Sequence, residues 1–218
     1  MDADPARPPA WGTAVLLTPR PISVIRSLRT HVLVLGASVA LLWAVFVIDW
    51  VLGGALAQYG VAPRSLPGLR GILFAPFLHA NFNHLAANTI PVLALGWLVM
   101  LRDPKHFILV VLAATLGGGL SAWLLGAPGS VHIGASGVIF GFLGFLIFAG
   151  WYARSFSSIA ISLVVIALWG GLVLGVLPAD AGVSWQTHLG GFVGGALAAR
   201  WFARSLPVFR ASRPVRLP

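Results

Sequence analysis

Long apolar segments alternate with short polar ones along most of this chain. The first, residues 32–52, would span roughly 31 Å as an α-helix, about the thickness of the hydrocarbon core of a bilayer. This segment and the stretch before it are both too long for a signal peptide, so we expect a retained first helix. Five further segments have a suitable length: residues 82–101, 106–125, 133–153, 159–177 and 185–203. The pattern predicts one all-α membrane domain, a bundle of six transmembrane helices.

The connections between these segments are short, with one long exception at residues 53–81. This connection contains Pro and Gly residues and then an apolar stretch, residues 72–78, that is too short to cross a membrane. We expect it to form an interfacial or re-entrant loop between the first two helices. We further expect residues 1–30 to be a largely unstructured or surface-lying arm, residues 31–204 the membrane domain, and residues 205–218 a basic tail.

The composition agrees with a membrane protein and restricts the available chemistry. Hydrophobic residues make up 58% of the 218 residues and charged residues 9%, against about 25% charged in an average soluble domain. A mean hydropathy of +0.93 also excludes intrinsic disorder. The chain has no Cys, and its five acidic residues are all Asp, so thiolate chemistry and mechanisms that need Glu are excluded.

The net charge of +9 is distributed unevenly about the predicted bundle. Alternating the six helices across the membrane puts twelve of the 14 Lys and Arg residues on one side and only Arg64 and Arg70 on the other. The positive-inside rule then places both termini in the cytoplasm and the long loop outside. Topology explains these charges better than a nucleic-acid partner, which we do not expect, whereas we expect contact with membrane lipids. Thirteen Arg against one Lys suggests a GC-rich bacterial genome, and so a location in the plasma membrane.

Three clusters of polar residues occur at helix starts, although polar side chains are costly in lipid. They lie in the second, fourth and sixth predicted helices: His79, His84 and Asn88; Ser136, within residues 134–137; and His188. In the predicted topology these three helix starts share the outer level of the membrane. Ser136 and His188 each lie three residues into their apolar segments, roughly 5 Å deep, so we expect the clusters to meet in one shallow pocket.

Small residues beside the polar ones would let the fourth and sixth helices approach closely. Two G-x-x-x-G pairs are present: Gly137 with Gly141, and Gly191 with Gly195. Close packing would bring the Ser136 Oγ within about 3 Å of a His188 nitrogen, the reach that a general base needs.

These residues favour acyl transfer by a Ser-His dyad. His188 would remove the proton of Ser136 during attack on a carbonyl group and return it to the leaving amine. The developing oxyanion needs fixed donors, which the Ser136 N–H at a helix N-terminus and the His84 and Asn88 side chains could supply. Gly134 and Gly137 would let the backbone around the nucleophile bend tightly.

Other polar residues stay outside the predicted site. Neither Asp49 nor Asp180 is well placed as the third member of a triad, so we expect a dyad. His106 and His132 have no partner that the sequence can identify, and we expect them at the membrane interface. No metal or other cofactor is predicted, because the chain lacks H-E-x-x-H and a clear acidic ligand.

The three clusters resemble the motifs of the rhomboid intramembrane serine proteases over residues 32–203. The matching motifs are H-x4-H-x3-N at His79, His84 and Asn88; G-x-S-G at residues 134–137; and H-x2-G-x3-G at His188, Gly191 and Gly195. The resemblance implies that Ser136 is the nucleophile, that His188 is the base, and that an acyl-enzyme forms. It also implies oxyanion donors at His84 and Asn88, and a supporting role for His79 in bracing the outer loop.

Two positions depart from the family pattern. Leu69-Arg70-Gly71 stands where the family often has Trp-Arg, so anchoring of the loop is expected to differ. Phe140 stands where many members have a Tyr that stacks on the catalytic His, so the ring stack is expected without the hydroxyl. The implied substrates are transmembrane proteins, cut near the outer face, with a small residue before the cut.

Each signal has a plainer interpretation that the sequence leaves open. A membrane-helix Ser commonly hydrogen bonds to its own backbone, and a His can serve packing alone. His79 could brace the loop or simply lie at the interface. An inactive rhomboid-like protein that binds clients is therefore the main alternative, while a transporter would usually show internal repeats and midplane polar groups, which are not seen here.

Overall fold

The computed structural model describes residues 21–153, 156–178 and 182–205, and this part of the chain is helical. No β-strand forms within it, and Val61 and His132 make a single isolated bridge. The longer helices are α1 (Pro21–Val51), α4 (Phe82–Met100), α5 (Pro104–Leu125), α6 (Ser136–Ala153), α7 (Phe156–Trp169) and α8 (Trp185–Ser205). The shorter elements are η1 (Ala55–Tyr59), α2 (Leu66–Leu69), α3 (Gly71–Phe74), η2 (Ala75–Phe77) and η3 (Gly170–Val176). The expected all-α class is confirmed for the described residues.

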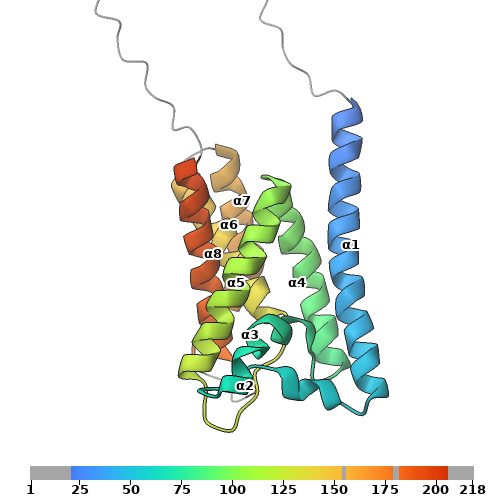
Figure 1. The fold of residues 1–218 in the computed structure, drawn as a ribbon. Helices are drawn as coiled ribbons and strands as arrows, with labels where there is room; N and C mark the ends of the chain where they lie inside the picture. Colours follow the sequence, from blue (N-terminus) through green and yellow to red (C-terminus); the bar gives the residue numbers. More distant parts are fainter. Residues whose placement is uncertain (1–20, 154–155, 179–181, 206–218) are drawn as a thin grey trace, which may run out of the picture.

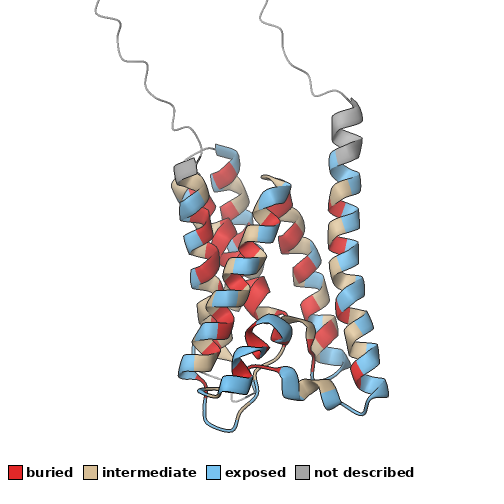
Figure 2. Cartoon of the chain, viewed as in Figure 1, coloured by how far each residue is buried: buried red, intermediate tan, exposed pale blue. Residues whose placement is uncertain are grey.

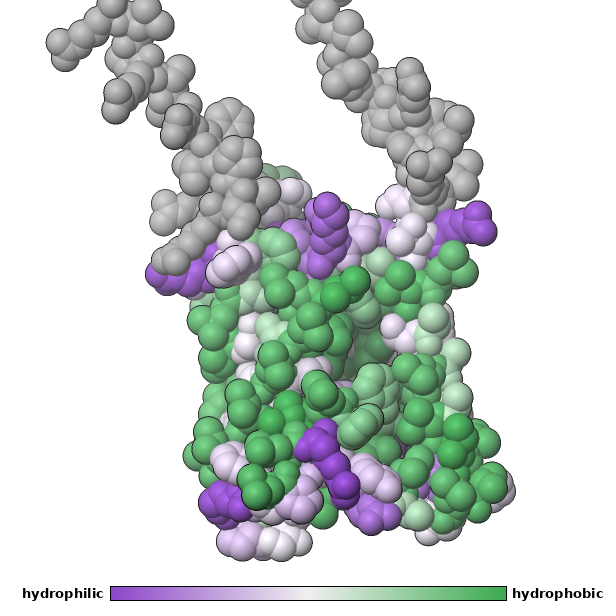
Figure 3. All heavy atoms as spheres, viewed as in Figure 1, coloured by the Kyte–Doolittle hydropathy of each residue, from purple (hydrophilic) through white to green (hydrophobic). Residues whose placement is uncertain are grey.

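Among the residues that the structure describes, four helical segments are long and apolar enough to cross a membrane: Ser27–Val51, Phe82–Met100, Pro104–Leu125 and Phe156–Val176. The apolar part of α6, Ser136–Tyr152, is shorter, and α8 is not among the four. An apolar belt separates two more polar ends of the molecule (Figure 3). The chain is therefore a multi-pass membrane protein, and six full spans remain a prediction.

Helix α6 lies at the centre of the bundle, between α5, α7 and α8 (Figure 1). Four of its side chains are almost completely buried: Phe142, Leu143, Phe145 and Leu146. Buried residues gather on the helices of the central group, whereas α1 is mostly exposed (Figure 2). Burial of large apolar side chains on one central helix stabilises the position of its first residue, Ser136.

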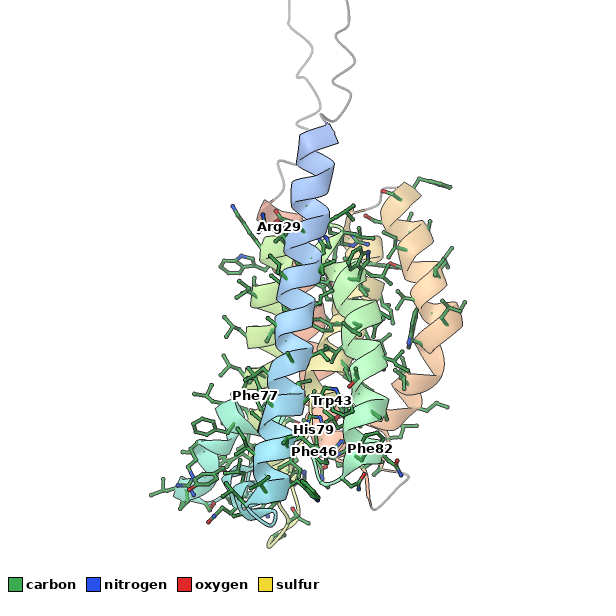
Figure 4. The ribbon with its side chains drawn as sticks, turned by 90° about the vertical axis from the view of Figure 1, so that its right-hand side faces the viewer. Arg29, Trp43, Phe46, Phe77, His79 and Phe82 are labelled. Carbon is green, nitrogen blue, oxygen red and sulfur yellow. The ribbon has the colours of Figure 1, made fainter. Side chains whose placement is uncertain are left out.

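Helix α1 packs along α4 at the edge of the bundle. The Trp43 Nε1 donates to the Thr89 Oγ1 at 3.2 Å, and the Trp43 ring meets Phe82 edge-on, with centroids 5.6 Å apart. Figure 4 shows Trp43 and Phe82 at the same end of the molecule as His79, far from Arg29. These contacts fix α1 to the start of α4, close to the candidate site.

Three helix boundaries differ from the sequence prediction. Helix α1 begins at Pro21 instead of residue 32, because Pro is favoured at the first helical position. Helix α6 begins at Ser136 instead of residue 133, since Gly134 has a φ of 119° that a helix does not allow. Helix α7 ends at Trp169 and continues as the tighter turn η3. The rest of the arm, residues 1–20, and nearly all of the basic tail lie outside the described residues.

The connection between α1 and α4 folds into short helical turns that dock on the end of α5. The Arg64 guanidinium donates to the Leu124 carbonyl at 2.9 Å, and the Trp123 indole donates to the Ser65 carbonyl at 2.9 Å. Arg70, which follows Leu69 in the position that departs from the family pattern, lies over the Tyr59 ring, 4.6 Å from its centroid. This loop is anchored by Trp123 on α5 and by a cation–π contact.

Backbone contact between α6 and α8 depends on glycine. A Cβ added at Gly191 would overlap the carbonyl of Gly137, and one at Gly195 would overlap that of Gly141. The predicted close approach of these two helices is confirmed. Because α4, α6 and α8 all start at the end of the bundle opposite to where α1 begins, the predicted polar clusters lie at one level (Figure 1).

Candidate active site

Ser136 and His188 lie in hydrogen-bonding contact at the starts of α6 and α8. The Ser136 Oγ is 2.8 Å from the His188 Nε2. Ser136 is the first residue of α6 and His188 lies in the first turn of α8, so the close glycine contact between these two helices brings both residues to the same region. His188 is buried, while Ser136 is half-buried and open to a cleft. The structure brings together the two residues that the sequence paired.

The hydrogen bond of the His188 Nδ1 shows which ring nitrogen carries the proton. Its Nδ1 lies 2.9 Å from the Gly175 carbonyl oxygen, which can only accept a hydrogen bond, so Nδ1 carries the proton. In the neutral ring Nε2 is then an acceptor, directed at the Ser136 hydroxyl. The Phe140 ring stacks on the other side of the imidazole, with centroids 4.0 Å apart and planes 7° from parallel. Sequence analysis missed Gly175, because a main-chain carbonyl leaves no signal in the residue types.

Gly134 has the conformation and the space that only glycine provides. Its φ of 119° lies in the region that side chains avoid, and a Cβ at this position would lie 2.7 Å from the His84 ring. The His84 ring therefore rests on the backbone two residues before Ser136. Helix α4 presents His84 from its first turn, where the Asn81 side chain accepts the His84 N–H at 2.9 Å.

Asn88 lies one turn further along α4 and is buried. Its Nδ2 donates to the His84 carbonyl oxygen at 2.8 Å, which orients the amide. An amide nitrogen has two hydrogens, so one remains for a ligand in the cleft. His84 and Asn88 thus share the Ser136 cleft, as the sequence predicted for a set of donors.

His79 lies behind these residues and is buried, with 2% of its surface exposed. The Ala135 N–H donates to its Nε2 at 3.4 Å, and its ring meets the His84 ring with centroids 5.1 Å apart. Burial, and then the neighbouring His84, lower the pKa of His79 to about 4, against the effect of a hydrogen bond with the Phe77 backbone. A neutral His79 therefore connects the outer loop to the residue before Ser136, which favours bracing over a free interfacial position.

An open cleft of about 870 Å³ lies beside Ser136. Side chains from α4, from the segment before α6, and from the start of α8 line it, among them His84, Asn88, His132, Ser136, Ser184 and His188. The cleft is large enough for several residues of an extended peptide, and its polar groups gather around the Ser136 hydroxyl.

The acidic residues serve other roles where the structure describes them. The Asp49 carboxylate accepts the Leu56 N–H at 2.7 Å, and Asp103 caps α5 by accepting the Lys105 N–H at 2.8 Å. Asp180 lies outside the described residues. No group of three His or Asp side chains in the described ranges is close enough to hold a metal ion.

His132 lines the cleft, whereas the sequence predicts a position at the membrane interface. Its Nδ1 is 2.6 Å from the Ser184 Oγ and its Nε2 is 3.0 Å from the Ser130 Oγ. Nothing in the residue types marks Ser184 as a partner of His132, because Ser184 is 52 residues away along the chain. Its position four residues before Ser136 was the available clue.

Comparison with known proteins agrees with these motifs. A family model described as a Rhomboid domain matches residues 67–205, which include the whole candidate site. An uncharacterised protein of Mycobacterium tuberculosis (strain ATCC 25618 / H37Rv) is 46% identical over 169 residues, 74% of this chain and 70% of that protein. The Rhomboid protease GluP of Bacillus subtilis is 31% identical over 150 residues, 66% of this chain and 29% of that protein. Rhomboid-like protease 5 of Toxoplasma gondii is 32% identical over 148 residues, 64% of this chain and 17% of that protein.

Proposed function

This chain belongs to the rhomboid family, and on that premise we propose that it is an intramembrane serine endopeptidase acting through Ser136 and His188. The observation that carries the proposal is the 2.8 Å contact between the Ser136 Oγ and the His188 Nε2. The other ring nitrogen of His188, Nδ1, already carries the proton, because it donates to the Gly175 carbonyl oxygen. A packing role for His188 would not require this tautomer. A hydroxyl aimed at an unprotonated nitrogen is the arrangement that general-base catalysis needs.

The reaction follows the acyl-transfer sequence. The Ser136 Oγ attacks the carbonyl carbon of the scissile peptide bond while its proton moves to the His188 Nε2. The tetrahedral intermediate then collapses, the C–N bond breaks, and the imidazolium gives that proton to the leaving amine. Water attacks the resulting ester with His188 again as base, which frees the acid product and restores the Ser136 hydroxyl.

Donors around Ser136 support stabilisation of the oxyanion. The first N–H groups of a helix have no acceptor within it, so the Ser136 N–H at the start of α6 is available. The second hydrogen of the Asn88 amide and a ring N–H of His84 lie in the same cleft. Fixed donors of this kind typically contribute about 100- to 1,000-fold each to the rate.

Transmembrane proteins are the substrate class that this site would accept. Substrates reach the cleft sideways from the lipid, and a helical substrate has its carbonyls hydrogen bonded, so the cleaved stretch has to unwind first. We therefore expect helix-weakening residues such as Gly or Pro near the cut, and a small residue before it. The twelve-to-two distribution of Lys and Arg supports cytoplasmic termini, a site near the outer face of the plasma membrane, and contact with membrane lipids.

Labelling with a fluorophosphonate tests this function without a known substrate. The probe reacts with activated serines, so the detergent-solubilised wild type should be labelled, whereas Ser136→Ala and His188→Ala should not. His106→Phe is a matched control: His106 is a half-buried histidine at the start of α5 whose ring lies tilted against the Phe202 ring, and this variant should label like the wild type. Folded wild type that neither labels nor cleaves a transmembrane reporter would instead support the inactive, client-binding alternative.

A further inference from the structure

His132 joins the two segments that carry Ser136 and His188. It lies four residues before Ser136, in the connection between α5 and α6, and its ring is hydrogen bonded on both sides. One partner, Ser184, is the residue immediately before α8. A single side chain thus connects the segment that leads to the proposed nucleophile with the helix of the proposed base.

The direction of the bond to Ser130 follows from a neighbouring carbonyl. The Ser130 hydroxyl lies 2.7 Å from the Ala127 carbonyl oxygen, which can only accept, so the hydroxyl donates there. The Ser130 Oγ then accepts from the His132 Nε2, which carries the proton. Burial lowers the pKa of His132 below its ordinary value, so the ring is neutral at pH 7 and its Nδ1 is an acceptor.

The direction of the bond to Ser184 follows in turn. Because the His132 Nδ1 accepts, the Ser184 hydroxyl donates to it across 2.6 Å. The Ser184 Oγ accepts from the Thr187 hydroxyl at 2.6 Å and from the Thr187 N–H at 3.4 Å. Every hydrogen in this chain, from Thr187 to Ser130, has an acceptor. Networks that are fully satisfied hold their members in one arrangement.

Ser184 is also the N-cap of α8. Its side chain accepts the N–H of the third helical residue, and its carbonyl oxygen accepts the His188 N–H at 3.1 Å. The helix that carries the proposed base therefore begins one residue after Ser184, the residue that contacts His132. A displacement of Ser184 would displace the His188 backbone with it.

The other side of His132 is held by the outer loop. Its N–H donates to the Val61 carbonyl at 2.9 Å, and its own carbonyl accepts the Val61 N–H at 3.0 Å. The main chain of His132 is therefore fixed to a second segment before it continues to Ser136. These two main-chain hydrogen bonds hold His132 in a fixed position relative to Ser136, the proposed nucleophile.

We propose that His132 is a positioning residue that sets the separation of Ser136 and His188 by tying the N-cap of α8 to the segment before α6. The inference rests on the proposed function and adds a residue to it. His132 acts through Ser184 and takes no part in bond making or breaking. Misplacement of a reacting group by about 1 Å can cost about 100-fold in rate, so a tie of this kind matters for the rate more than for binding.

Three substitutions separate the two bonds of His132. His132→Asn places an amide oxygen near the position of Nδ1 and keeps an acceptor for Ser184, whereas His132→Gln places its amide near Nε2 and keeps only the bond to Ser130. His132→Phe keeps the ring and removes both bonds. The kcat and KM for a transmembrane reporter, and the rate of fluorophosphonate labelling, are measured in detergent beside thermal melting curves.

We expect kcat to fall about tenfold or more in His132→Phe and His132→Gln, and by less than about threefold in His132→Asn, with KM unchanged. Ser184→Ala should cause a loss like that of His132→Phe, and the double variant should lose no more than the larger single loss, since both remove one connection. His106→Phe, a histidine variant at the other end of the bundle, should retain the wild-type kcat.

The outcomes separate this role from the proposed function. A His132→Phe protein with wild-type kcat would overturn the positioning role, and so would fully additive losses in the double variant. Should His132→Phe fail to fold, the comparison of Asn with Gln decides, and equal kcat in these two variants counts against the role. A wild type that neither labels nor cleaves would overturn the proposed function, and the positioning role with it.

Discussion

The Gly175 carbonyl oxygen lies 2.9 Å from the His188 Nδ1, and this main-chain contact fixes the proton on that nitrogen. A carboxylate in this place would stabilise an imidazolium by its charge, whereas a carbonyl offers a dipole. The proposed catalytic pair thus depends on orientation, given by Gly175 at the edge of the ring and by Phe140 on its face.

Gly175→Ala is expected to reduce activity through this contact. An added Cβ would lie 2.9 Å from the Phe140 ring and 3.4 Å from the His188 Nδ1, so the stacked ring has to shift. We expect kcat for a transmembrane reporter to fall about tenfold, because a small displacement of the base impairs proton transfer. Gly171→Ala, in the same turn η3 with open space around its added Cβ, should remain within about twofold of the wild type. Equal effects in the two variants would argue against a role for the Gly175 contact.

Gly134→Ala tests whether the His84 ring has to rest on the backbone before Ser136. The variant combines backbone strain, at a φ of 119°, with a Cβ 2.7 Å from the His84 ring. Gly129→Ala carries strain alone, at a φ of 78° with nothing near its Cβ. We expect both to lower the free energy of unfolding by about 1–3 kcal/mol, and only Gly134→Ala to abolish labelling by a fluorophosphonate. Full labelling of a folded Gly134→Ala protein would contradict the assigned place of His84.

Gly195→Ala should weaken the contact between α6 and α8. The new methyl group would overlap the Gly141 carbonyl, and such overpacking typically costs about 1–3 kcal/mol. Gly36→Ala, at an exposed position of α1 with open space around the Cβ, should instead stabilise the protein by about 0.5–1 kcal/mol through helix propensity. Thermal melting in detergent distinguishes the expected destabilisation by Gly195→Ala from the expected stabilisation by Gly36→Ala. An unchanged melting temperature for Gly195→Ala would show that α6 and α8 can move apart without a loss of stability.

Acid should destabilise the protein through His79. The pKa of His79 is about 4 in the folded protein, because of burial and the neighbouring His84, and 6.5 is its ordinary value. The unfolded chain therefore binds more protons between these values, so stability is complete above pH 6.5 and is lost as the pH falls towards 4. His79→Gln keeps an acceptor for the Ala135 N–H without titrating. Its melting temperature should depend less on pH across this range, and an unchanged slope would exclude His79 as the cause.

The sequence allowed the pairing of Ser136 with His188 because polar residues inside apolar segments stand out, and because topology placed both at one level. The glycine pairs that bring α6 and α8 together were visible for a similar reason, since small residues repeat at a helical spacing. The start of α6 was wrong by three residues, because hydropathy alone does not reveal the φ of Gly134.

The supporting contacts could not be predicted in the same way. Every residue has a carbonyl, so nothing in the residue types marks Gly175 as the partner of His188. The role proposed for His132 could not be predicted, because it depends on a tertiary contact between the segments before α6 and α8, which are 52 residues apart. Phe140 was predicted by resemblance alone, and the stacked geometry agrees with it.

The backbone contact between α6 and α8 also limits how this protein can move. Two helices that touch through glycines, with no side chain between them, have little room to slide or rotate against one another. Together with the proposed His132 tie, this contact would make Ser136 and His188 move as one rigid unit when the bundle flexes. Under the proposed function, any widening that admits a polypeptide from the lipid would then come from the surrounding elements, while the distance between the proposed nucleophile and base stays constant.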